Sequence, residues 1–126
     1  SVMMITSCTA TIEPINVTLI ITAGEDEILH VTMPISTKDP TILSLVSEAA
    51  MIYEIDITYN ENGDSVKDIE NYLERKDENG VTYFWEYLIN DQLPENTTGG
   101  KAKDQLIEDG MTITYRYATY DPSTSR

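Results

Sequence analysis

The sequence is short of the residues that most often carry chemistry. Its 126 residues include one Cys, one His, one Trp and one Phe. A catalytic nucleophile and its base must lie within hydrogen-bonding distance of each other. Cys8 lies in a β-prone N-terminal stretch and His30 on the outer face of a predicted strand, two unrelated contexts that do not predict such a pair. No Gly-rich, phosphate-cradling loop precedes a helix. We therefore predict a protein without enzymatic activity, and His30 as a surface residue.

Basic residues are also scarce, and this excludes two classes of partner. Eight Lys and Arg stand against 22 Asp and Glu, which gives a net charge of −14. Such a chain is repelled by nucleic acid and by anionic membrane surfaces. There is no run of 18 apolar residues, so no transmembrane helix is expected. Residues 1–10 lack the basic start and long apolar core of a signal peptide, so we expect a mature or trimmed chain.

Acidic residues are plentiful, yet their spacing predicts no metal site. A calcium loop needs oxygen ligands at its first and twelfth positions. The loop around Gly80 would begin at Arg75, and the loop around Gly63 would end at Ile69. Neither residue supplies the required oxygen.

Three positions point to an extracellular setting. Asn16 and Asn96 both begin the pattern that accepts an N-linked glycan. Cys8 has no second Cys for an internal disulfide, and an odd Cys in a secreted chain suggests an intermolecular pair. An inert thiol and a lipid-anchored Cys are the alternatives. We predict a secreted glycoprotein with Asn16 and Asn96 as acceptors and Cys8 as an intermolecular thiol.

Apolar residues at alternate positions predict most of the strands. Segments 15–22 and 28–35 alternate cleanly around a turn at 23–26, which predicts a hairpin. Segment 55–59 is predicted as a further strand with Tyr59 inward, 66–73 as an edge strand, 74–80 as a charged loop and 111–117 as the last strand. Between the strands, an apolar stripe at helical spacing predicts one helix over 41–52, capped by Asp39 with Pro40 at its first position and completed by Ile52 or Tyr53.

The stretch 81–90 holds the only Trp, the only Phe and two of the eight Tyr. Its aromatic content predicts a strand, with Tyr83, Trp85 and Tyr87 on one face. Because both faces are apolar, we expect this strand in the middle of the sheet. A ligand on the Trp85 face is the alternative interpretation, since Tyr and Trp combine an apolar body with a polar tip.

The order of elements is a hairpin, a helix and then several strands. A right-handed crossover through the helix would place all strands in one mixed sheet with the helix on one face. The predicted fold class is α+β, a β-grasp-like mixed sheet with a single packed helix and a β-prone N-terminal arm. The predicted organisation is an extended arm over 1–14, the β-grasp domain over 15–118 and a tail over 119–126.

Five segments in this order resemble a known family. They are the strand beginning at Ile15, the helix 41–50, Gly63 followed by Val66 and Ile69, the run Phe84-Trp85-Glu86-Tyr87-Leu88, and 106–117 with Glu108-Asp109-Gly110. Together they are similar to the C-terminal β-domain of the cobalamin carriers intrinsic factor and transcobalamin, and to related bacterial domains of unknown function.

The resemblance implies a secreted, non-enzymatic module that contacts a small, corrinoid-like ligand, with cobalamin as the implied cofactor. It places the site at Trp85, Tyr87, Gly63, Ile69 and the 94–105 loop, represented by Gly99. A lone domain offers only one wall of a pocket, so we expect weak binding. The alternative is a self-associating extracellular structural protein, in which the arm 1–12 adds a strand to the edge of a neighbouring chain.

Overall fold

Long strands stand at both ends of the region that the structure describes. The structure is a computed structural model, and it describes residues 12–94 and 101–124. Its elements in chain order are β1 (Ile15–Ala23), β2 (Asp26–Ile35), α1 (Ile42–Tyr53), β3 (Ile57–Tyr59), β4 (Val66–Ile69), β5 (Arg75–Lys76), β6 (Thr82–Ile89) and β7 (Thr112–Tyr120).

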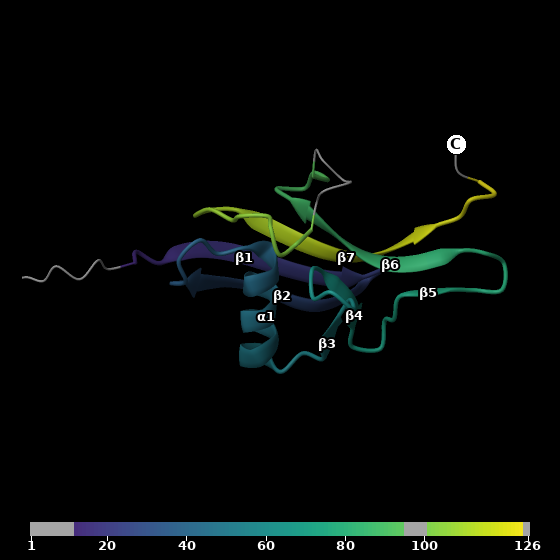
Figure 1. Cartoon of the computed structure of the whole chain (residues 1–126), viewed down its shortest axis with the longest axis horizontal. Helices are drawn as coiled ribbons and strands as arrows, with labels where there is room; N and C mark the ends of the chain where they lie inside the picture. The colour runs from purple at the N-terminus through teal and green to yellow at the C-terminus, as the bar shows by residue number, and fades with distance from the viewer. Residues whose placement is uncertain (1–11, 95–100, 125–126) are drawn as a thin grey trace, which may run out of the picture.

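The main sheet has five strands in the order β2-β1-β7-β6-β5 (Figure 1). The first and last strands, β1 and β7, lie side by side and are parallel, whereas the other pairs are antiparallel. A parallel pair needs a crossover, and the chain from β2 to β6, which includes α1, provides it. This mixed sheet with one helix confirms the predicted α+β, β-grasp-like class.

The aromatic strand β6 was predicted to lie in the middle of the sheet. It lies instead second from one edge, between β7 and the short edge strand β5. β7 covers β6 along its whole length, while β5 pairs with it only at Thr82 and Tyr83. The middle position belongs to β7, and β1, like β6, is second from an edge. The prediction failed because aromatic residues on both faces of a strand can be buried by loops and by a second small sheet as well as by neighbouring strands.

The predicted edge strand 66–73 is shorter than predicted and does not belong to the main sheet. Its first four residues form β4, which pairs with β3 in a separate two-stranded sheet. The chain then turns, because the backbones of Ile69 and Tyr72 bond to each other. The predicted strand at 55–59 likewise begins only at Ile57, and Tyr59 is exposed rather than inward. The predicted charged loop 74–80 contains β5.

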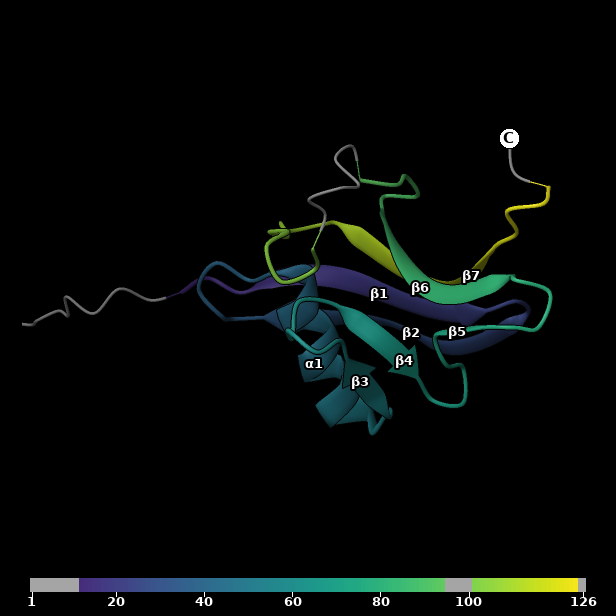
Figure 2. The same cartoon turned by 45° about the vertical axis from the view of Figure 1, so that its right-hand side comes forward.

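The helix and the small sheet cover one face of the main sheet (Figures 1 and 2). Alternate residues of β1 and β7 point into this layer and meet the buried stripe of α1. Burying these apolar side chains is the main favourable contribution to folding. The fully buried residues of the core include Val17, Leu19, Ile21, Ile42, Leu45, Val46, Ala49, Ile69 and Ile113.

The N-cap of the helix lies two residues after the predicted one, Asp39. Thr41 is the N-cap, and its hydroxyl accepts a hydrogen bond from the Ser44 N–H at 3.2 Å. The Thr41 N–H in turn donates to Ser44 Oγ at 2.8 Å. Asp39 instead has a positive φ of 51°. The segment around Thr41 stays extended because it pairs with the segment around Leu106.

The end of the helix also differs from the prediction. Ile52 and Tyr53 do not complete the apolar stripe, because they are 55% and 41% exposed. The helix ends at Glu54, which adopts the left-handed conformation and donates its N–H to the Ala50 carbonyl. The buried stripe therefore stops at Ala49.

The buried stripe of α1 generates a stability prediction. We expect Leu45→Ala to lower the free energy of unfolding by about 2–5 kcal/mol, because the side chain is fully buried and its removal leaves a cavity. Met51→Ala is the matched control on the same helix, since Met51 is 77% exposed. Urea melts followed by circular dichroism would check both variants. Equal effects of the two substitutions would contradict the assignment of the buried face.

Candidate functional site

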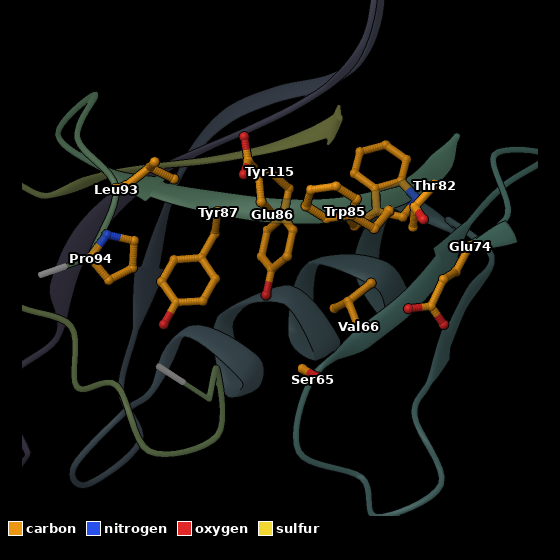
Figure 3. Close-up of a pocket in the computed structure, with 11 residues that line it drawn as sticks. Ser65, Val66, Glu74, Thr82, Trp85, Glu86, Tyr87, Leu93, Pro94 and Tyr115 are labelled. Carbon is orange, nitrogen blue, oxygen red and sulfur yellow. The ribbon is translucent and has the colours of Figure 1, made fainter. Parts of the chain in front are cut away.

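A cavity of about 460 Å³ opens along the outer edge of β6, next to the point where the short strand β5 ends. Figure 3 shows Pro94 and Tyr87 at one end, Glu74 at the other and Val66 between them. Both faces of β6 contribute side chains. The cavity is lined by Ser65, Val66, Glu74, Thr82, Phe84, Trp85, Glu86, Tyr87, Leu93, Pro94 and Tyr115.

An aromatic cluster holds Trp85 in this wall. The Trp85 indole N–H donates to the Tyr72 carbonyl at 2.8 Å, and the two rings meet edge to face with centroids 6.3 Å apart. Tyr117 packs against both rings, with its centroid 5.3 Å from that of Trp85 and 5.4 Å from that of Tyr72. The Tyr117 hydroxyl donates to the Leu73 carbonyl at 2.7 Å. The Tyr72 hydroxyl donates to Asp26 Oδ2 at 2.7 Å. These contacts tie the segment 72–74, which carries Glu74, to the sheet.

Two tyrosines from neighbouring strands form the deepest part of the cavity. Tyr87 of β6 lies opposite Tyr115 of β7, with ring centroids 5.7 Å apart. Both rings point toward the layer that contains α1 and β4 (Figure 3). Burial raises the pKa of both hydroxyls above the usual value for tyrosine. Among the residues that the structure describes, the buried Tyr115 hydroxyl has no hydrogen-bond partner.

The charge around the cavity is negative. Two of its lining residues, Glu74 and Glu86, are acidic, and none of the described lining residues is Lys, Arg or His. Glu86 is paired with Arg116 on β7. Asp64, next to the lining residue Ser65, is buried and pairs with Lys101 at 3.0 Å. This hydrogen bond raises the pKa of the Lys101 ammonium.

The structure brings together only part of the predicted site. Trp85 and Tyr87 both line the cavity. Ile69 does not line the cavity, because it is fully buried in the core. Gly63 lies in the turn before β4 with φ of 72°, near Ser65 but outside the lining. Gly99 lies outside the described residues.

The other predicted site residues concern modification and assembly. Asn16 is exposed at the start of β1, a position that can carry a glycan. Asn96 and Cys8 lie outside the described residues. His30 is exposed, as predicted.

Several lining residues were absent from the predicted site. Tyr115 belongs to the predicted last strand 111–117, but only the pairing of β6 with β7 places it against Tyr87. Pro94, the first residue of the predicted 94–105 loop, does line the cavity. Leu93 immediately precedes it, so its proximity had a signal in the sequence. No signal in the sequence placed Ser65, Val66 and Glu74 near β6, because the small sheet and the turn after it bring them there.

Within residues 12–94 and 101–124, no group of three or more His, Cys, Asp or Glu side chains could hold a metal ion. In the same part of the chain, no helix is long and apolar enough to cross a membrane.

No protein-family model and no curated protein matches the sequence. Solved structures do match its fold. One is haptocorrin in complex with Cbi, with a TM-score of 0.67 and 12% identity over 89% of this chain. The match covers 27% of haptocorrin, so the chain spans about a quarter of that protein's length. This likeness confirms, at the level of the fold, the resemblance to the β-domain of cobalamin carriers.

A second match is to a protein from Ruminococcus gnavus ATCC 29149, described provisionally as a metal binding protein. Its TM-score is 0.53 at 12% identity, over 84% of this chain and 98% of that one. The domain fold of this chain thus also occurs in a bacterial protein that consists of little else.

The aromatic cluster generates a prediction about the cavity wall. We expect Trp85→Phe to lower the free energy of unfolding by about 1 kcal/mol, because the half-buried Tyr72 carbonyl loses its shorter hydrogen bond, at 2.8 Å, and keeps only the one from the Ile69 N–H at 3.2 Å. Urea melts followed by far-ultraviolet circular dichroism would measure this loss. An unchanged midpoint and slope would mean that the bond does not hold Trp85 in the wall.

Proposed function

We propose that this chain is a non-enzymatic, extracellular binding module whose cavity along β6 takes a small organic ligand. The observation that carries the proposal is the cavity itself, which combines aromatic walls with a few polar groups. Ligand sites in proteins have this composition, and a volume of about 460 Å³ falls in their usual range. The exposed Asn16, at a glycan-acceptor sequence, supports the extracellular setting.

A corrinoid is the first ligand to test. The fold likeness to haptocorrin, which was solved in complex with Cbi, supports this choice. The chain spans only about a quarter of haptocorrin, so the ligand would meet a single wall here. We therefore propose affinity of roughly millimolar strength, about −4 kcal/mol.

The matched pair Leu93→Arg and Leu106→Arg tests whether ligands enter this cavity. The two leucines are 50% and 52% exposed, so neither substitution should disturb folding, and only Leu93 lines the cavity. We expect dicyanocobinamide to give measurable heat with the wild-type protein in isothermal titration calorimetry. Leu93→Arg should abolish that heat because its side chain obstructs the opening, while Leu106→Arg should leave it unchanged.

The possible outcomes distinguish an error in the location of the site from an error in the choice of ligand. Heat that survives Leu93→Arg would place binding elsewhere on the molecule. The absence of heat at millimolar corrinoid would remove corrinoids from the proposal, and the cavity would then be tested with other small molecules.

A second candidate function is self-association through the N-terminal arm, and the free edge of β2 favours it. Among the described strands, β2 pairs only with β1, so its second edge is unoccupied along Asp26–Ile35. Such an edge can accept an added strand from another chain. The segment 1–12 has strand-forming composition, and Cys8 within it could lock the joint. The predicted edge strand 66–73 does not provide an edge of the main sheet, because its first four residues form β4 of the small sheet.

Deletion of residues 1–12 tests the second candidate. If the arm links chains, the full-length protein should sediment as an oligomer, and the deletion variant as a folded monomer. Cys8→Ser should leave assembly largely intact, because backbone pairing would supply most of the attraction. A full-length protein that sediments as a monomer in oxidising buffer at high concentration would exclude the linking role.

A further inference from the structure

The Tyr115 hydroxyl is the one feature of the cavity that the packing of the described residues leaves unexplained. Tyr115 is 2% exposed, and its hydroxyl has no hydrogen-bond partner among the described residues. A buried hydroxyl without a partner destabilises the folded state, because it has given up its hydrogen bonds to water. Such groups are rare in folded proteins, and a site for a bound molecule is one recognised reason for them.

The surroundings of this hydroxyl keep it protonated. Burial is the main reason that its pKa lies far above the usual value for tyrosine, and the nearby hydroxyls of Tyr87 and Tyr59 raise it further. Tyr59 is itself hydrogen-bonded to Ser47 at 2.9 Å. At neutral pH the Tyr115 hydroxyl is therefore a buried hydrogen-bond donor in the wall of the cavity, in surroundings where a hydrogen bond is electrostatically strong.

Charge decides which acceptor can reach this donor. Glu74 and Glu86 line the cavity, and Glu86 is already paired with Arg116. None of the described lining residues is itself basic, so no lining cation is available to an anionic ligand. An anionic ligand would meet these carboxylates and would lose its hydration without a cation to compensate. A neutral oxygen, such as that of an amide, ketone or ether, avoids both penalties.

We propose that the cavity selects an uncharged ligand with an apolar body and a neutral acceptor oxygen, to which the Tyr115 hydroxyl donates a hydrogen bond. This inference rests on the proposed function, because it names the ligand class of the same cavity. Trp85, Leu93 and Pro94 contact the apolar body, and Tyr115 discriminates by the charge and position of the oxygen.

The pair cinnamamide and cinnamate tests the inference, because the two probes share an apolar body and differ in an amide against a carboxylate. The Trp85 indole N–H gives the only tryptophan resonance in a proton NMR spectrum, and its ring lines the cavity. Titrations that follow this resonance should show cinnamamide binding at least about tenfold more tightly than cinnamate to the wild-type protein.

Tyr115→Phe should weaken cinnamamide roughly fivefold to tenfold, the effect of one lost hydrogen bond, and should narrow the preference over cinnamate. Tyr120→Phe is the matched control, since it removes a hydroxyl from the exposed end of the same strand. It should leave both affinities unchanged. Near-ultraviolet circular dichroism would show whether the Tyr115 variant is folded. If it is not folded, the ratio of the wild-type affinities for cinnamamide and cinnamate alone tests the inference.

The failure of this inference differs from the failure of the proposed function. Equal wild-type affinities for the two probes, or an unchanged affinity in Tyr115→Phe, would overturn the role of Tyr115 while leaving ligand binding intact. In that case Leu93→Arg should still abolish the shift of the Trp85 resonance. If neither probe shifts this resonance at millimolar concentration, the proposed function fails and the inference fails with it.

Discussion

The parallel pairing of β1 with β7 is the constraint on which the rest of the structure depends. It joins Thr18–Thr22 to Thr112–Arg116, so the two ends of the domain meet in the centre of the sheet. Every other element must then fit on one side of this pair or in the crossover between them. β2 extends the sheet beyond β1, β6 and β5 extend it beyond β7, and α1 covers one face.

The cavity follows from how the crossover returns to the sheet. After α1 the chain forms β3 and β4 as a sheet of their own, and β5 reaches β6 only at its first two residues. β4 then lies near β6 without pairing with it. The space between them is walled by side chains from β6 and β7 and by the residues that begin β4. A longer β5 would have closed this space with backbone hydrogen bonds.

The aromatic residues that hold the sheet and its covering layer together also line the cavity. Trp85 fills the wall while its indole N–H bonds to the backbone of Tyr72. Tyr115 lies directly behind the cavity and packs against Tyr87, and its hydroxyl has no partner among the described residues. Aromatic rings can serve both purposes because each joins a large apolar surface to one polar group. The buried hydroxyl of Tyr115 distinguishes a candidate binding surface from an ordinary core.

Local patterns in the sequence were sufficient for the hairpin, the helix stripe, the last strand and the fold class. Alternation and helical spacing report which side of an element is buried, and Val17, Leu19, Leu45 and Ile113 are buried as expected. Trp85 and Tyr87 could also be singled out, because their residue types and their shared face are local properties of one strand.

The tertiary structure alone decided strand order, the start of the helix and the composition of the cavity. Thr41 caps α1 because its neighbours pair with the distant segment around Leu106. Ile69 lies in the core rather than in the site, and Tyr115 meets Tyr87, because of pairings between segments far apart in the chain. A sequence pattern reports how much of an element is buried, but the partner that buries it is chosen by packing across the whole domain.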